Sequence, residues 1–264
     1  MDNTLFHDLG VFKQVLILYA TFFLRYIIFA GGAFLFFYIL YKTKFQKFRI
    51  QKNFPEKDKI RMEIVFSLTT FIIFACMGLF TSWLQRNGYG HIYKHLNDYP
   101  TWWFWLSIPA MLILHDTWFY WSHRFMHLKF VFPYVHRVHH LSNNPTPWAS
   151  FSFHPIEAVI EGLIIPLIVV VMPVHVYAIL IFLLLMTIMN VIGHLGYELF
   201  PAGFTKRILT RVNNTSTHHN MHHRLVKCNY GLYFNFWDSL MGTNHEKYHE
   251  HFEEVVAARK IEME

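Results

Sequence analysis

Long apolar stretches separated by short polar ones dominate the first half of the chain. Residues 11–41, 64–84 and 102–121 are almost wholly apolar. A helix needs about 20 apolar residues to cross the hydrocarbon core of a bilayer, and each stretch is long enough. The pattern therefore predicts three membrane-spanning helices within residues 11–121.

The second half of the chain holds two apolar runs enclosed by polar sequence. Residues 156–171 and 174–192 are apolar and meet at Met172-Pro173, a sequence that favours a turn. We expect these runs to form a helical hairpin that enters or crosses the bilayer and returns to the same side. The predicted fold is all-α: a polytopic integral membrane protein of one domain, residues 1–264, with about four hydrophobic helices or hairpin segments.

The distribution of positive charge predicts the orientation in the membrane. Residues 42–61 hold eight lysines and arginines, and loops rich in these residues stay on the cytoplasmic side. Counting spans from this loop places the N-terminus outside and the polar chain of residues 122–264 on the cytoplasmic side. We expect the net charge of +6 to reflect such loops rather than nucleic-acid binding. We expect no cleavable signal peptide, because the first apolar run is too long.

Composition supports a membrane protein and adds one anomaly. Hydrophobic residues make up 54% of the chain and charged residues 15%, whereas soluble domains carry about 25% charged residues. The chain has 19 histidines but two cysteines, Cys76 in an apolar run and Cys228 in a polar one. The cysteines predict no disulfide and favour a reducing compartment. The abundance of histidine is what requires a chemical explanation.

Three short boxes hold most of the clustered histidines. In a helix, residues three and four apart share a face, so each box presents two or three imidazoles in one direction. Four further histidines stand singly near the boxes or the ends of spans. The candidate metal ligands are His123 and His127; His136, His139 and His140; His219, His222 and His223; and the single residues His115, His154, His194 and His218. The other histidines are expected to be ordinary polar residues, His245 being the best placed of them to support a ligand.

Twelve candidate imidazoles exceed what one metal ion needs. A zinc site uses about four ligands, whereas two ions with roughly five or six ligands each would use nearly all of them. An all-nitrogen site suits iron, copper or zinc rather than magnesium or calcium. Two irons beside a membrane suggest oxygen activation, with the apolar spans forming a water-shielded slot for a lipid. The histidines would then be ligands rather than acid–base groups.

Acidic residues near the boxes are candidates for orienting the ligands. Asp116 and Asp238 are predicted to accept an imidazole N–H and fix its tautomer. Asp238 is equally suited to cap a turn in the chain that follows it. Glu157 and Glu161 are placed to pair with a ligand histidine or with a cation of the first span, and Glu198 is placed to support a neighbouring histidine.

The order and spacing of these motifs carry a resemblance to a known family. The motifs are His115-Asp116, Tyr120-Trp121-Ser122-His123-Arg124, His127, the box at 136–140, Pro145-Thr146-Pro147, Ala149-Ser150-Phe151, His154-Pro155, the box at 218–223, Asn229-Tyr230-Gly231, Trp237-Asp238 and Gly242-Thr243. In this order they resemble the fatty acid hydroxylase and sterol desaturase superfamily of membrane di-iron oxygenases. The stretch 145–155 looks most like the sterol C5-desaturase branch.

The resemblance implies an integral membrane enzyme that uses two iron ions, O2 and two electrons. Such an enzyme hydroxylates or desaturates a lipid, either a sterol or a fatty-acyl chain. Carried over motif by motif, the resemblance makes the twelve histidines the iron ligands. Electrons would come from NAD(P)H through a separate redox protein, such as a b-type cytochrome or a ferredoxin. The membrane would be the endoplasmic reticulum in a eukaryote or the inner membrane in a bacterium.

The sequence leaves three alternatives open. Within the same chemistry, the substrate could be a carotenoid or an ether lipid. A metal transporter with a histidine-rich cytoplasmic face would place ligands near the middle of several spans. A zinc-dependent membrane hydrolase would turn over its substrate without O2 or reductant.

Overall fold

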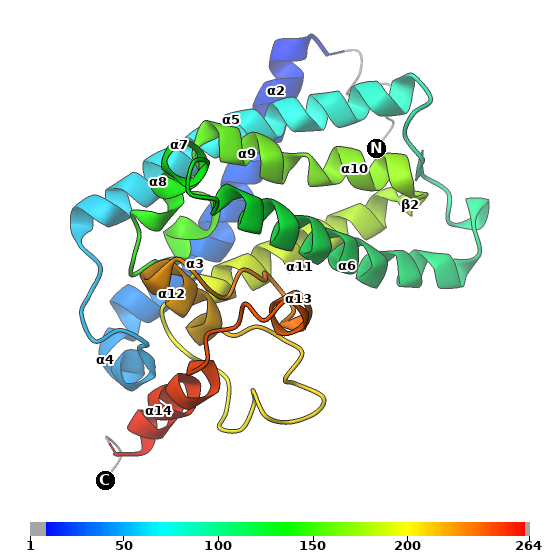
Figure 1. Ribbon diagram of the computed structural model, residues 1–264. Helices are drawn as coiled ribbons and strands as arrows, with labels where there is room; N and C mark the ends of the chain where they lie inside the picture. Colours follow the sequence, from blue (N-terminus) through cyan, green and yellow to red (C-terminus); the bar gives the residue numbers. More distant parts are fainter. Residues whose placement is uncertain (1–8, 262–264) are drawn as a thin grey trace.

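The computed structural model describes residues 9–261 as a bundle of long helices with a polar layer at one end (Figure 1). The first long helical segment begins with α2 (Val11–Tyr26). It continues through a π-helical turn, α3 (Gly32–Phe34) and a second π-helical turn to Leu40. The other long helices are α5 (Lys57–Arg86), α6 (Thr101–Met126) and α11 (Val176–Gly193).

Three of the described helices are long and apolar enough to cross a membrane. They are the segment Val11–Leu40, α5 and α11. Helix α6 covers residues 102–121 but is not one of these three helices, so the third span stays a prediction. The helix continues to Met126, so the first histidine box forms its end. The prediction of an all-α, multi-pass integral membrane protein is confirmed.

The predicted hairpin consists of α9 (Pro155–Gly162), α10 (Ile164–Val171) and α11. Pro166 explains why α9 and α10 are separate helices. Proline lacks an N–H and its ring clashes with the carbonyl group four residues earlier, which belongs here to Gly162, the last residue of α9. At the hairpin tip, β2 (Val174–His175) pairs in parallel with β1 (Ile92–Tyr93), a contact that the apolar pattern does not predict.

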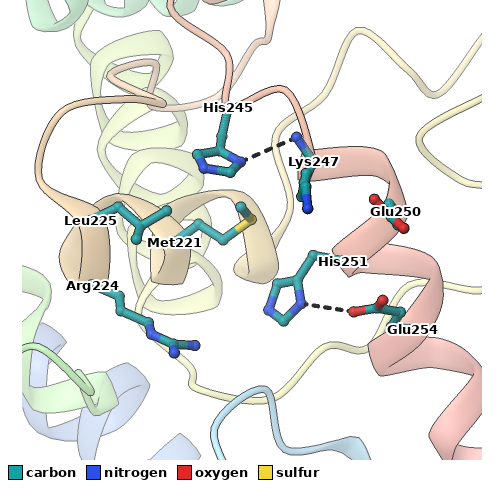
Figure 2. A pocket seen from close by; sticks show the side chains of 8 residues that line it. All are labelled: Met221, Arg224, Leu225, His245, Lys247, Glu250, His251 and Glu254. Atoms are coloured by element: carbon teal, nitrogen blue, oxygen red, sulfur yellow. Dashed lines mark hydrogen bonds and ion pairs between the residues drawn. The ribbon is translucent and has the colours of Figure 1, made fainter.

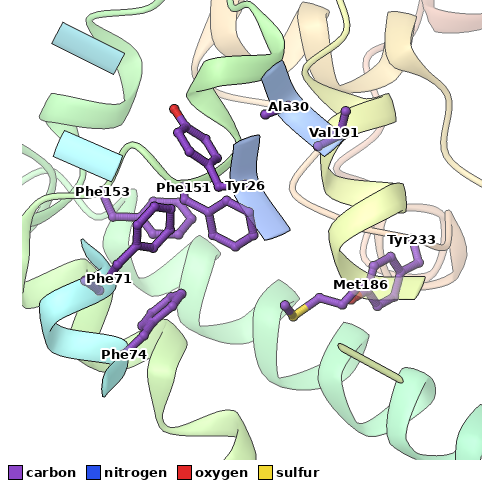
Figure 3. Close-up of a cluster of buried hydrophobic side chains, with 10 residues drawn as sticks. Tyr26, Ala30, Phe71, Phe74, Phe151, Phe153, Met186, Val191 and Tyr233 are labelled. Atoms are coloured by element: carbon purple, nitrogen blue, oxygen red, sulfur yellow. The ribbon is translucent and has the colours of Figure 1, made fainter. Parts of the chain in front are cut away.

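An aromatic core joins the first two helices to the chain between the histidine boxes (Figure 3). Phe71 of α5 packs against Tyr26 of α2 and against Phe151, with ring centroids 5.1 and 5.8 Å apart. The hydroxyl groups of Tyr26 and Ser67 both donate to the carbonyl oxygen of Trp148, at 2.8 and 3.0 Å. The 3₁₀ turn Pro147–Phe151 is thereby held inside the bundle, next to the second box.

The polar layer contains short helices that carry or flank the boxes. They are α4 (Lys42–Phe45), α7 (Phe132–Val135), α8 (Arg137–His140), α12 (Ser216–Leu225), α13 (Phe236–Leu240) and α14 (Tyr248–Ile261), with a 3₁₀ turn at Gln46–Phe48. A second 3₁₀ turn, Leu96–Asp98, follows β1 near the tip of the hairpin. Helix α12 carries the third box and lies between α11 and α14 (Figure 1).

Helix α12 is polar in sequence, yet the residues from Ser216 to His223 are all buried. Its N-terminal donors have side-chain acceptors: Glu198 accepts from the backbone and hydroxyl groups of Thr217, at 2.9 and 2.7 Å, and Thr215 caps the amide of His218. The hydroxyl group of Ser216 donates to the carbonyl oxygen of Ile192 in α11. These bonds offset the cost of burying helix ends. Glu198 therefore fixes α12 rather than supporting His194.

Gly196 connects the end of α11 to the strand-like segment that leads to Glu198. Its φ of +73° lies in the left-handed region. A Cβ at this position would lie 2.5 Å from the hydroxyl oxygen of Tyr38 and 3.2 Å from the carbonyl oxygen of Pro145. The turn after His194 therefore requires glycine.

We expect Gly196→Ala to lower the free energy of unfolding by about 1–3 kcal/mol from backbone strain, with the steric contact adding to it. Thermal unfolding of the purified protein in detergent would report this as a lower Tm. Gly32→Ala is the matched control, because a Cβ there meets nothing within 4 Å. An unchanged Tm in Gly196→Ala would contradict the strain argument.

Candidate metal centre

Nine of the predicted histidines converge in two adjacent groups. They come from the end of α6, from the α7–α8 segment, from the residue that follows α11 and from α12. Within each group the nitrogen atoms lie within 4.8 Å of one another. The first group is His123, His127, His136, His140 and His222, and the second is His139, His194, His219 and His223.

In the first group, five imidazoles direct their Nε2 atoms to one point. The Nε2 atom of His123 lies 3.0 Å from that of His136 and 3.2 Å from that of His127. The Nε2 atom of His140 lies 3.2 Å from that of His127 and 3.1 Å from that of His222. His127 and His140 are half-buried, and the other three are buried.

In the second group, all four imidazoles are buried. The Nε2 atom of His194 lies 3.0 Å from that of His219, 3.3 Å from that of His223 and 3.4 Å from that of His139. The rings of His139 and His140 are neighbours in sequence but belong to different groups, with centroids 5.9 Å apart. Box two and box three each contribute to both groups, so the two groups form one continuous centre.

The hydrogen bonds of the outer nitrogens decide which tautomer each imidazole has. An Nδ1 atom that faces a carbonyl oxygen must carry the proton, which leaves Nε2 as a lone-pair acceptor. Nδ1 faces a backbone carbonyl oxygen in five cases: His123 with Tyr230, His139 with Ser152, His194 with Asn190, His222 with Cys228 and His223 with Ser142.

This arrangement fits metal ions and little else. Lone pairs that face one another at about 3 Å repel unless a proton or a cation lies between them. Burial, followed by the neighbouring imidazoles, holds the pKa values of His139, His222 and His223 well below their ordinary range and lowers that of His140 to about 3. Protonation at neutral pH is thus disfavoured, and the neutral donors suit iron, copper or zinc.

Within the part of the chain that the structure describes, one carboxylate forms a hydrogen bond with a clustered histidine. The Nδ1 atom of His136 lies 2.7 Å from Oε1 of Glu157, and both side chains are buried. Glu157 stands three residues after His154 at the start of α9. The sequence marked Glu157 only as one of several acidic residues near the boxes, because no spacing rule connects it to His136.

The two carboxylates that the sequence singled out instead hold the backbone of residues 230–234. Asp238 accepts from the amides of Tyr230 and Gly231, at 2.9 and 2.6 Å. Asp116 accepts from the amides of Tyr233 and Phe234, at 2.8 and 3.2 Å. This loop supplies the carbonyl oxygen that fixes His123, so both residues act on the centre through the backbone. Neither accepts an N–H of the nine clustered imidazoles.

Three predicted ligands lie outside the two groups. His115 is buried with its Nδ1 atom 2.8 Å from the hydroxyl oxygen of Tyr233, two helical turns before His123. His154 caps α9 by accepting from the amide of Ile156. The Nε2 atom of His218 lies 3.5 Å from Oδ2 of Asp238, because one residue along α12 turns its side chain about 100° away from His219.

His245 and His251 line a separate pocket of about 370 Å³ between α12 and α14 (Figure 2). The Nδ1 atom of His245 accepts from the amide of Lys247, and that of His251 lies 3.4 Å from Glu254. The pocket is lined by charged residues of both signs, Arg224 among them. Its histidines belong to neither metal group, and His245 supports no ligand.

The region that holds the clustered histidines is also the region that matches known proteins. Residues 108–243, more than half of the chain, match the family "Fatty acid hydroxylase". Lathosterol oxidase of Mus musculus is 32% identical over 191 residues, which cover 71% of this chain and 62% of that protein. A Delta(7)-sterol 5(6)-desaturase of Gibberella zeae is 29% identical over 190 residues, which cover 71% and 57%.

The human lathosterol oxidase is 31% identical over 189 residues, with the same coverage as the mouse protein. The chain thus matches less than two thirds of the length of these relatives. No solved structure gives a significant match. The family match contains all nine clustered histidines, from His123 to His223. The chain belongs to the fatty acid hydroxylase family.

Proposed function

We propose that this protein is a membrane-bound di-iron oxidoreductase that uses O2 and a reductant to hydroxylate or desaturate a lipid of the sterol type. The observation that carries the proposal is the paired centre itself. Nine imidazoles, five in one group and four in the other, turn their Nε2 atoms toward two adjacent points, and in six of them the partner of Nδ1 leaves Nε2 unprotonated. A single structural zinc site would use about four of them.

The five-histidine and four-histidine groups would each hold one iron. When bound, the two irons supply the reduction of O2 and the oxidation of an unactivated C–H bond. The protein's own contribution is to keep the imidazoles neutral and in one tautomer, through the backbone acceptors and Glu157. The buried positions of His194 and His219 exclude water from the second group.

A lipid substrate follows from where the centre lies. The ligands stand at the end of α6, just after α11 and on α12, next to helices long and apolar enough to cross a membrane. The sterol class is suggested by relatives named lathosterol oxidase and Delta(7)-sterol 5(6)-desaturase. Ligands at helix ends also argue against a metal transporter, which needs them near mid-membrane.

Further elements of the proposal are the electron source and the side of the membrane. We assign the electrons to a separate redox protein that is reduced by NAD(P)H, such as a b-type cytochrome or a ferredoxin. The basic segment 42–61 supports a cytoplasmic position for the centre. This segment contacts the polar layer: the amide of Glu198 donates a hydrogen bond to the carbonyl oxygen of Phe48.

The proposed reaction is tested with iron-loaded protein in lipid nanodiscs, given lathosterol, a b-type cytochrome and its NADH-dependent reductase. We expect O2 uptake coupled to NADH oxidation, and a product that has either lost two hydrogens or gained one oxygen by mass spectrometry. The same mixture without O2 serves as the control. Conversion of the sterol without O2 would overturn the oxygenase assignment and favour a hydrolytic or isomerising enzyme.

We expect His222→Ala to reduce bound iron from two per chain to one or fewer and to abolish sterol-dependent O2 uptake, because the first group loses one of its five imidazoles. Elemental analysis of purified protein gives the iron content. His245→Ala is the matched control, since His245 belongs to neither group. Full iron content in His222→Ala would contradict the ligand assignment.

Glu157→Ala is expected to weaken iron binding about 10- to 100-fold, because His136 loses the acceptor that fixes its tautomer. Competition with a chelator of known iron affinity measures the change. Glu250→Ala, on the exposed side of α14, removes a carboxyl group without contacting a ligand and should bind iron like the wild type. Equal affinities in the two variants would refute the role of Glu157.

A further inference from the structure

A cavity of about 190 Å³ lies among the apolar helices, between α2, α5, the α9–α10 pair and α11. Its walls include Leu18, Met77 and Leu183, which are all partly exposed, so the cavity reaches the outer surface of the bundle. Two polar side chains line it. The hydroxyl group of Thr81 already donates a hydrogen bond to the carbonyl oxygen of Met77. Glu161 is the other polar side chain, and it can form further hydrogen bonds.

A smaller cavity of about 30 Å³ lies next to the first. The two cavities share Phe74, Glu161 and Met186 as lining residues. Figure 3 shows Phe74 on one side and Met186 on the other, from α5 and α11. The shared residues make the two spaces neighbours, with Glu161 bordering both.

One layer of side chains separates the inner cavity from the two histidine groups. The ring of Phe119, which lines the cavity, packs on the ring of His123 of the first group, with centroids 4.9 Å apart. Asn190, another lining residue, provides the carbonyl oxygen that fixes His194 of the second group. A molecule in the cavities would therefore lie close to both groups.

Glu161 stands where the two cavities meet and is 7% exposed. Its Oε1 atom accepts one long hydrogen bond, 3.4 Å from the hydroxyl oxygen of Ser122. Among the residues that the structure describes, nothing contacts Oε2 through a hydrogen bond, and Glu161 forms no ion pair. Oε2 is accessible from the cavity rather than sealed in the interior, so it is open to a hydrogen bond with a molecule that enters.

We propose that Glu161 binds the hydroxyl group of the lipid substrate and thereby selects sterols. The inference rests on the proposed function, because it assigns the ligand of the same centre. The inner cavity is small, so the group bound by Glu161 must lie only a few bonds from the carbon that is oxidised. A sterol has its hydroxyl group on the ring system itself. A fatty-acyl lipid has its polar group at one end of a long chain.

The proposal separates the roles of two glutamates that are one helical turn apart on α9. Glu157 contacts His136, whereas Glu161 forms no hydrogen bond or ion pair with a described histidine and lines both cavities. A purely structural role for Glu161 would be served by the bond to Ser122. That role would show no dependence on the chemistry of the lipid.

The test measures binding of radiolabelled lathosterol to the full chain in nanodiscs, in competition with unlabelled lathosterol and with its 3-deoxy counterpart. We expect the wild type to bind lathosterol at least about tenfold more tightly than the 3-deoxy compound, as one lost hydrogen bond predicts. In Glu161→Leu the two affinities should fall within about twofold of each other. Glu161→Gln should keep part of the preference, because its amide oxygen accepts a hydrogen bond.

Glu250→Leu, on the surface of α14, is the matched control and should retain the wild-type preference. If the wild type shows no preference for the hydroxylated compound, the proposal is overturned. This result needs no variant, so the test remains decisive even if Glu161→Leu misfolds. Wild-type preference in an iron-loaded Glu161→Leu also overturns it. Iron content and O2 uptake are measured on the same wild-type sample. Two irons and sterol oxidation without hydroxyl preference would refute the role of Glu161 alone, whereas absence of iron and oxidation would refute the proposed function.

Discussion

The outward hydrogen bonds of the histidines are the interaction on which the centre depends. Five Nδ1 atoms donate to backbone carbonyl oxygens and that of His136 faces Glu157, so six Nε2 lone pairs are fixed toward the interior. The acceptors come from several segments of the chain, none of them within a histidine box. The folded backbone therefore sets the tautomers, and a centre of this kind cannot be assembled from the boxes alone.

The same constraint explains why a polar helix is buried. Helix α12 must bring His219, His222 and His223 to the inside, so its polar residues leave water with it. Glu198 and Thr215 satisfy its N-terminal donors, and Asn229 donates to the carbonyl oxygen of His218. Asp238 then orders the loop that follows. Buried polar networks of this type stabilise a structure only when nearly every member has a partner.

The sequence predicted the first two spans, the apolar helix α11 and the convergence of the three boxes, because apolar runs and histidine spacing are readable features. It overestimated residues 102–121, which form a helix that is not among the candidate spans. It also anticipated His194, which stands alone but follows a span. It did not separate the nine clustered histidines from His115, His154 and His218, since a single histidine has no spacing that reveals its direction. Ser142, Ser152 and Asn190 accept from the histidines through their backbone carbonyl groups. Every residue has such a group, so the sequence does not indicate which residues act as acceptors.

Helix α9 connects the metal centre with the apolar interior. Its first turn brings Glu157 to His136, and the next turn brings Glu161 to the junction of the two cavities. Pro166 ends this helix at Gly162, and Gly162 has no Cβ, which would lie 2.8 Å from Met77. The break and the close approach to α5 thus place one glutamate toward each site. A shift of α9 would move the partner of His136 and the lining of the cavity together, so one helix couples the histidine groups to the apolar interior.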